Sequence, residues 1–459
     1  MPLQKKIFKI VPICAAAIIY SAAVFAQDNS PLSRFGVGDV APNSHQVLRA
    51  MGGITAAIGS ATTNGTYINN ANPASYPYLA YPKNSKFLGR TILDIGVDYS
   101  KHTIKNTTPI NKYSSNNLVF SYVQVGIPLD TPQRWGLVFG LKPYSNISYN
   151  VNRRSKVFAT GDSLLSQFEG NGGAYKAFMG TGYRIGGLSI GINTGYLFGK
   201  KNFATRNAFI NDSVIFYPGN FENKTNFGTV FLETGIQYRQ KINTTDNLTL
   251  GFTYNTQTNL KATKDVIKET YVQNPTTKQI DSLDRIKIST NLAGTIIIPA
   301  SFTVGFTYER ELSDDIKIKK PSFMIGAQYE ATPWSTYRFY GSSEGLVNSS
   351  TFRVGGFYYN PYTKNANKKP SYFNAIIYRA GYYFTNGANG LNNVKHSAFT
   401  FGLGVPLSTA SYYNSEVSFL NLSIEIGSRT GLTNFKENFF KIGAGFSLSD
   451  IWFIKRKYN

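Results

Sequence analysis

Leu248-Thr249-Leu250-Gly251-Phe252-Thr253-Tyr254-Asn255 alternates apolar residues with small or polar ones along its whole length. An alternation of period two is typical of a β-strand, because successive side chains point to opposite faces of the sheet. The pattern recurs at residues 93–100, 188–198, 302–308 and 420–426. The sequence therefore predicts an all-β protein whose strands have one apolar and one polar face.

The N-terminus has the order of a secretory signal peptide. Three lysines precede an apolar run over residues 10–25, and the small residue Ala26 follows. A run of about 16 residues is shorter than the ~20 that a membrane-spanning helix needs, so a cleaved signal is favoured over an anchor. We expect residues 1–26 to be a signal peptide whose removal leaves an exported chain without cysteine.

About fourteen stretches of the chain have strand character. They are expected at residues 87–100, 117–127, 135–149, 173–185, 188–199, 225–240, 248–260, 291–310, 316–331, 350–360, 372–384, 397–406, 416–427 and 438–449. Connections after odd-numbered strands are mostly long, and those after even-numbered strands are mostly shorter. The long ones are expected at residues 101–116, 150–172, 200–224, 261–290, 332–349, 385–396 and 428–437.

Alternation alone leaves two fold classes open. In a soluble sandwich the apolar face packs on a core, whereas in a membrane barrel it faces lipid and the polar face lines the lumen. An aromatic content of 15%, 42 glycines, the export signal and the even strand number favour the barrel. We predict a transmembrane antiparallel β-barrel of about fourteen strands in a Gram-negative outer membrane, with both chain ends in the periplasm.

The formal net charge is +22 at pH 7, so the partners of the basic groups have to be considered. Lysine and arginine are dispersed among predicted loops and strand ends, whereas nucleic-acid binding typically clusters them in a stripe. We therefore exclude nucleic acid and expect contact with outer-membrane lipid, including the phosphates of lipopolysaccharide.

Residues 27–86 precede the first strand and are dense in Gly, Asn, Pro and Ala. Irregular backbone cannot face lipid, because its polar groups would stay unpaired, so this segment must lie in the periplasm or plug the lumen. We predict an N-terminal hatch over residues 27–86 and a barrel over residues 87–459.

Short motifs in the hatch and barrel resemble the FadL/TodX family of outer-membrane transporters for hydrophobic compounds, in the form predicted for Bacteroidetes. They are Ser30–Asp39, Met51-Gly52-Gly53, Asn69–Ala74 with its Asn72-Pro73-Ala74 end, Lys142-Pro143-Tyr144-Ser145, Gly170–Gly173 and Asp450–Phe453. The resemblance implies a hatch that blocks the lumen, uptake of a hydrophobic small molecule from outside, and a kinked third strand that opens laterally into the bilayer.

Two interpretations of these residues stay open. Pro143 has no amide hydrogen for a neighbouring strand, so Gly140, Lys142, Pro143, Tyr144 and Ser145 could frame the lateral opening, or Pro143 could lie where pairing is ending anyway. The hatch motif Met51, Gly52, Gly53, Asn72, Pro73 and Ala74 could position a plug that shifts on ligand binding, or its glycines could serve tight packing alone.

Enzyme signatures are weak. The string Gly187–Gly191 fits G-x-S-x-G, but Ser189 falls inside a predicted strand, whereas a nucleophile elbow needs a strand followed by a helix. Metal-ligand spacing is lacking among the three histidines, which are His45, His102 and His396. Asp94 and Asp98 share a face of the first strand, where a hydrated or Arg-paired wall residue is commoner than an acid pair. We expect no enzyme activity, no catalytic residue, no metal and no cofactor.

Two functions follow from these observations. The first is a channel for passive uptake of hydrophobic small molecules such as long-chain fatty acids. The alternative is a structural or secretion-associated barrel that binds a partner protein and transports nothing. An apolar cavity continuous with a gap in the wall would favour the channel, and a lumen filled by polar side chains would favour the alternative.

Overall fold

The computed structural model describes most of the chain. The described residues are 30–42, 44–59, 67–79, 90–107, 110–130, 134–157, 162–210, 216–273, 276, 280–310, 322–360, 372–408, 417–432 and 435–450. The predicted signal peptide and residues 451–453 of the terminal motif lie outside them.

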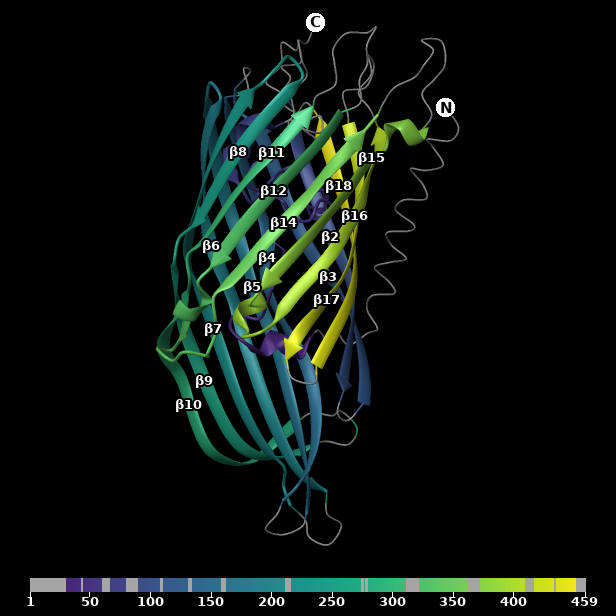
Figure 1. Cartoon of the computed structure of the whole chain (residues 1–459). Coiled ribbons are helices and arrows are strands. Elements are labelled where there is room, and N and C mark those ends of the chain that lie inside the picture. The colour runs from purple at the N-terminus through teal and green to yellow at the C-terminus, as the bar shows by residue number, and fades with distance from the viewer. Residues whose placement is uncertain are drawn as a thin grey trace, which may run out of the picture.

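The described strands form a closed antiparallel barrel (Figure 1). It has fourteen positions around the wall, each filled by one strand or by two strands end to end, and we call each position a stave. Two staves are each interrupted once, so that β8 continues into β9 and β10 into β11. The strands are β2 (Thr91–Thr107), β3 (Ile110–Pro128), β4 (Trp135–Lys156), β5 (Ser163–Ile185), β6 (Leu188–Ile210), β7 (Gly219–Lys241), β8 (Asp246–Asn255), β9 (Thr258–Gln273), β10 (Ile280–Ile298), β11 (Ser301–Arg310), β12 (Ser322–Thr332), β14 (Ser349–Tyr359), β15 (Ile377–Asn386), β16 (Lys395–Ser408), β17 (Val417–Leu432) and β18 (Phe435–Asp450). Pairing of β18 with β2 closes the barrel.

Short elements lie inside the barrel and in its connections. The plug contains α2 (Gln46–Arg49), the two-residue strand β1 (Asp39–Val40) and the 3-10 helices η2 (Pro31–Arg34) and η4 (Pro73–Tyr78). The connections contain η5 (Trp334–Thr336), β13 (Arg338–Phe339), η6 (Tyr372–Ala375) and η7 (Ala388–Gly390). Within the described residues, no helix is both long and apolar enough to cross a membrane.

Side-chain exposure along the strands identifies the outer surface as the lipid-facing one. On β6, Ile190 is 49% and Ile192 is 41% exposed, whereas Ser189 before them and Asn193 after them are 0% exposed. A soluble sandwich would bury the apolar face instead. The outward apolar face and the buried polar face therefore confirm the predicted barrel fold.

The predicted strand number is confirmed, but several predicted long connections are wrong. Residues 163–172 and 200–210, for example, continue β5 and β6 in register from Ser163 opposite Ile210 down to Ile185 opposite Leu188. Outside the bilayer both faces of a strand contact water, so the apolar alternation stops while the backbone pairing goes on. The amphipathic pattern marks the membrane-spanning part of a strand and not its end.

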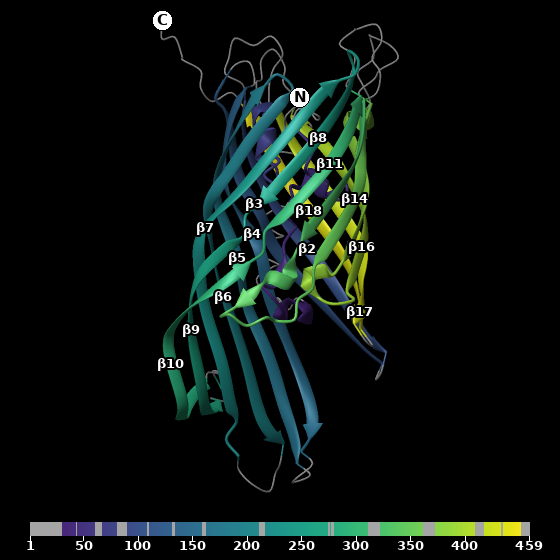
Figure 2. The same ribbon diagram turned by 60° about the vertical axis from the view of Figure 1, so that its left-hand side comes forward.

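These extensions stand on one side of the barrel. We call the open sheet made of residues 147–156, 163–172, 200–210, 219–228, 258–273 and 280–295 the outer wall; it belongs to β4, β5, β6, β7, β9 and β10. Figure 2 shows it extending well beyond the ends of β14, β16 and β17. On its side away from β9, β10 pairs in register with β13 at Ile296 and Ile297.

The plug lies in the lumen and packs on the inner surface of the barrel. One buried cluster joins Leu48, Met51 and Ile54 of the plug to Met324 and Phe357 of β12 and β14. Residues 30–79, where described, are therefore held by the barrel as part of its core, and they position the groups considered next.

Candidate functional site

The glycine turn after α2 lies directly against the barrel backbone. Gly52 and Gly53 have φ of 72° and 76°, a region that glycine adopts without strain. A Cβ atom at Gly52 would lie 2.6 Å from the Val354 carbonyl oxygen, and one at Gly381 would lie 2.2 Å from the Gly52 nitrogen. Glycine is therefore needed on both sides of this contact, for close approach as well as for φ.

Met51 and further glycines of the wall extend this contact around the lumen. A Cβ atom at Gly355 would lie 2.3 Å from the Met51 carbonyl oxygen, and one at Gly251 would lie 2.0 Å from that of Ala56. We call the wall residues that receive the plug backbone in this way the glycine platform; they are Gly136, Gly182, Gly191, Gly251, Gly355 and Gly381. The plug is thus fitted to the wall at the level of backbone atoms.

The second part of the hatch motif begins η4. Asn72 caps this helix, since its Oδ1 accepts from the Ala74 amide at 3.0 Å while its Nδ2 donates to the Ala56 carbonyl at 2.5 Å. Pro73 provides the first helical residue, whose missing amide hydrogen is not needed there, and its carbonyl lies against Gly182 and Gly191. Tyr76 further along η4 is fully buried, and burial raises its pKa.

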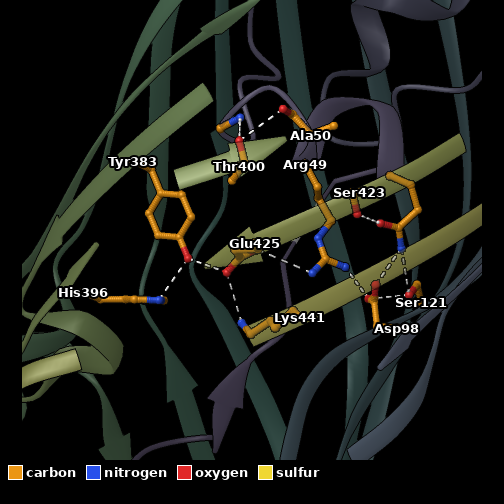
Figure 3. A network of polar contacts seen from close by, with 12 residues as sticks. Arg49, Ala50, Asp98, Ser121, Tyr383, His396, Thr400, Ser423, Glu425 and Lys441 are labelled. Atoms are coloured by element: carbon orange, nitrogen blue, oxygen red, sulfur yellow. Dashed lines mark hydrogen bonds and ion pairs between the residues drawn. The ribbon is translucent and has the colours of Figure 1, made fainter. Parts of the chain in front are cut away.

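Arg49 of α2 connects the plug to two barrel carboxylates (Figure 3). Its guanidinium pairs with Asp98 of β2 and lies 3.7 Å from Oε2 of Glu425 of β17. Burial alone would lower the pKa of Arg49, but the two carboxylates outweigh it and hold the pKa above its ordinary value. Arg49 is 6% exposed, so this is a buried charged link in the lumen.

Hydrogen bonds extend the network on both sides of Arg49. Glu425 accepts from the Tyr383 hydroxyl at 2.6 Å and lies 3.4 Å from Lys441 Nζ. Gln46 Nε2 donates to Asp98 at 2.7 Å. The Gly52 amide donates to Thr400 Oγ1 at 2.8 Å, which ties the glycine turn to β16 (Figure 3).

A second charged link holds the N-terminal end of the plug. Arg429 of β17 makes a bidentate contact with Asp39 of β1 at 3.0 and 3.2 Å. Glu437 of β18 accepts from the Ser30 hydroxyl at 2.9 Å and contacts His102. Breaking either link would leave a buried charge without its partner, which is strongly unfavourable.

The structure gives structural roles to most residues that were examined for catalysis. Asp98 is the Arg-paired wall residue expected, and Asp94 accepts from the Ile68 amide at 2.8 Å. Ser189 lies inside β6 and donates to the Gln237 carbonyl at 3.5 Å, so it forms no nucleophile elbow. His45 caps α2 by accepting from the Val47 amide. Among the described residues, no cluster of His, Cys, Asp and Glu could hold a metal ion.

The ladder between β3 and β4 is interrupted at the predicted lateral opening. It extends from Pro128 opposite Gly136 to Val123 opposite Leu141, while β4 continues to pair with β5 as far as Lys156. Lys142 and Pro143 follow the last β3–β4 pair directly. The register of β4 on β5 also shifts between Pro143 and Ser145. Beyond Leu141 we call this boundary the β3–β4 seam.

The plug covers part of the seam from inside. Val40 of β1 lies opposite Ser145, the Ala41 amide donates to the Tyr144 carbonyl at 3.0 Å, and Ser145 Oγ donates to the Val37 carbonyl at 2.7 Å. Gly140 lies just before the seam, and a Cβ atom there would lie 2.5 Å from the Val123 carbonyl oxygen. Lys142 is buried and points to Asn70 of the plug, with Nζ 3.5 Å from Oδ1. Opening of the seam stays a prediction.

Two spaces adjoin the plug and the seam. The inner one has a volume of ≈ 200 Å³ and contains the charged groups of Arg49, Glu330, Arg353, Glu425 and Arg429 in its lining. The outer one is an apolar groove on the lipid-facing side of β3 to β7, and it includes Val123, Phe139, Leu141, Met179 and Val230. The inner space therefore has several charged groups in its lining, and the apolar groove lies on the outer surface.

Solved structures similar to this chain include two toluene transporters. The Pseudomonas putida toluene transporter TodX is 16% identical with a TM-score of 0.50, and the match covers 91% of this chain and 100% of that one. The Ralstonia pickettii toluene transporter TbuX is 15% identical with a TM-score of 0.48, covering 92% and 100%. At such identity the likeness concerns the fold alone, and the match to TodX confirms the expected FadL/TodX-type barrel.

Sequence comparison gives a family as well. A family model described as BamG matches residues 5–459. No curated protein is significantly similar to the sequence.

Proposed function

This chain belongs to the BamG family, and from the geometry of its interior we propose that it is a sealed outer-membrane barrel that acts by binding other proteins. The observation that carries the proposal is the double charged link between plug and wall, Arg49 to Asp98 and Glu425, and Arg429 to Asp39. Because these links hold the plug in the lumen, the barrel would stay closed while its outer surface binds a partner.

Passage through the lumen would require the plug to move away from its links. Separating Arg49 from its carboxylates leaves buried charges without their partners, and such a break costs ~3–5 kcal/mol for a buried pair. A hydrophobic ligand offers no charge in compensation. The plug backbone also lies against the glycine platform, which leaves no apolar path between plug and wall along those contacts.

The outer wall is the surface that we assign to protein binding. The sequence predicts that both chain ends lie in the periplasm. In that orientation the outer wall extends from the cell surface. The edge of β10 there carries exposed Leu283, Ile286 and Ile288, and Ile286 is 66% exposed. An edge strand with apolar side chains is a template for a strand of another protein. Register shifts between Ser282 and Asp284 and between Arg285 and Lys287 would limit indiscriminate pairing.

The second candidate is passive uptake of hydrophobic small molecules, long-chain fatty acids for example. It is favoured by the β3–β4 seam and by the apolar groove beside it on the outer surface. In this case part of the plug that covers the seam, near Val40, would move to let the ligand pass sideways into the bilayer.

A disulfide across β1 and β4 separates the two candidates. Val40 and Ser145 are directly opposite each other, next to the hydrogen-bonded pair Ala41 and Tyr144. They therefore form a non-hydrogen-bonded pair, in which the side chains are closer together than in a hydrogen-bonded pair and suit a disulfide. The mature chain has no other cysteine to interfere. We expect Val40→Cys/Ser145→Cys to cross-link and to keep the same protein contacts at the outer wall as each single variant does.

Uptake and partner contact are measured on the same variants. If the barrel is sealed, vesicles that contain the double-cysteine variant should take up no more oleate or toluene than vesicles without protein. This should hold whether the disulfide is formed or reduced. A photo-cross-linker at Ile286 should give a discrete protein adduct in intact cells, while one at lipid-facing Ile190 should give none. Uptake that the disulfide abolishes and reduction restores would overturn the proposal in favour of the channel.

A further inference from the structure

Four exposed lysines lie in one register across five neighbouring strands. Lys395 of β16 is opposite Thr430 of β17, which is opposite Lys436 of β18. Lys436 is opposite Lys105 of β2, and Lys105 is opposite Lys112 of β3. Directly opposite residues share a face of the sheet, and we call this set of four the lysine row.

The lysine row lies on the outward face of the barrel, and at β16 and β18 it lies just beyond the apolar band. On β16, Lys395 is followed at intervals of two residues by Ser397 and the exposed Phe399. On β18, Lys436 is followed in the same way by Asn438 and the exposed Phe440. Residues two apart on a strand lie on the same face, separated by about 6.7 Å. At β16 and β18 the row therefore begins at the level where lipid headgroups meet the protein.

A register of short side chains lies between the lysines and the aromatic rings. Its members pair in order across the five strands and are Ser397, Ser428, Asn438, Thr103 and Ser114. Because these side chains are short, a groove of ≈ 620 Å³ crosses the strands here. Lys101 and Asn438 contribute to its polar part, and Phe399, Ile426 and Phe440 to its apolar part. The groove thus matches a molecule with a polar head and apolar chains.

An anionic partner from outside the chain would relieve the mutual repulsion of the lysine row. Like charges directly opposite on neighbouring strands repel each other, and Lys105 has a lysine on both sides. Within the described part of the chain, no carboxylate lies in ion-pair distance of Lys105, Lys112 or Lys436, and Glu437 next to Lys436 points into the lumen.

We propose that the lysine row and the groove below it bind the phosphate groups and acyl chains of an outer-leaflet glycolipid such as lipopolysaccharide. Four inter-strand steps separate Lys395 from Lys112, which is a width of about 19 Å. One phosphodiester headgroup is too narrow to contact the whole row, whereas a lipid with two phosphates on a wide, multi-chain base fits it. The site does not depend on whether the barrel transports or binds proteins.

The test measures lipid retention by native mass spectrometry of the full protein in detergent. The probe is bis-phosphorylated, hexa-acylated lipid A, with phosphatidylglycerol as the single-phosphate lipid and inorganic phosphate as competitor. The test variant is Lys105→Gln/Lys112→Gln/Lys436→Gln. The control variant Lys156→Gln/Lys200→Gln/Lys261→Gln removes the same charge from exposed positions of β4, β6 and β9, which are not neighbours in the sheet.

We expect the test variant to retain at least 10-fold less lipid A than the wild type and the control variant to stay within 2-fold. Heat-dependent migration in electrophoresis checks that both barrels are folded. Equal loss in both variants, or no loss in either, overturns the site. Retention of phosphatidylglycerol as strong as that of lipid A, or displacement of lipid A by millimolar inorganic phosphate, overturns the assignment to a glycolipid.

Discussion

Replacing Arg49 with methionine tests the link that holds the plug. Methionine keeps much of the side-chain volume and removes the charge, so Asp98 and Glu425 lose the guanidinium that they share. The helix α2 and the glycine turn keep their own hydrogen bonds, such as Gly53 N to Leu48 O at 2.9 Å. The variant therefore weakens the docking of the plug without altering its local structure.

The expected magnitude follows from what each carboxylate retains. Asp98 keeps donors on Gln46 and Ser121, and Glu425 keeps Tyr383 and Lys441. We therefore expect ~3 kcal/mol, the lower end of the range for breaking a buried ion pair. Every ~1.4 kcal/mol is a factor of ten in an equilibrium constant, so the undocked population should rise ~100-fold.

Hydrogen–deuterium exchange in nanodiscs measures this population through the amide of Gly52. The Gly52 amide is protected by Thr400 of the wall, so it exchanges when the turn leaves the wall. We expect ~100-fold faster exchange in Arg49→Met and no change in Arg153→Gln, which removes an exposed arginine of β4. Exchange at Gly52 within 3-fold of the wild type would show that the ion pairs do not hold the plug.

Further variants test other contacts of the plug and the outer wall. Gly52→Ala should lower the unfolding temperature of the barrel more than Gly186→Ala does, because both residues have positive φ but only the first would place its Cβ against the wall; equal shifts would contradict the close approach. Asn72→Ala removes the cap of η4 and should cost ~1–2 kcal/mol in chemical unfolding of the refolded protein; an unchanged midpoint would contradict it. Ile286→Asp should abolish a protein adduct formed from a photo-cross-linker at Leu283, and an adduct of unchanged yield would remove the β10 edge from consideration.

The staves of the barrel could be predicted from sequence because each carries its own signal. The alternation extends over about ten neighbouring residues and does not depend on distant parts of the chain. Leu248–Asn255 can therefore be recognised as a strand from its own sequence. Interruptions within a stave were not predicted, because residues 256–257 between β8 and β9 have no turn signal. Strand extensions beyond the bilayer were missed for the physical reason that water on both faces removes the alternation.

The plug contacts could not be predicted from sequence. Arg49 is a charged residue between Leu48 and Met51, which hints at a buried charge, but its partners Asp98 and Glu425 are far apart in the chain. They meet only because the barrel closes between β18 and β2. Glycine at positions 52 and 53 indicated either close approach or positive φ, and the structure requires both.

The interruption of the β3–β4 ladder near Pro143 could be predicted from sequence, but its cover by β1 could not. The missing amide hydrogen of Pro143 predicted an interrupted ladder, and the β3–β4 pairing does stop next to it at Leu141. The sequence did not indicate that β1, from the far end of the hatch, would pair with β4 at Ser145 and Asn146. A two-residue strand has too little pattern to be recognised, so the cover of the seam was missed.

The glycine platform bears on the order in which the protein assembles. Backbone of the plug touches backbone of the wall at Gly251, Gly355 and Gly381, so there is no clearance for the plug to be threaded into a finished barrel. The plug precedes every stave in the chain and is exported first. We therefore expect the staves to curl around a plug that is already present, with β18 joining β2 last, and a chain without its plug to stall as an unclosed sheet.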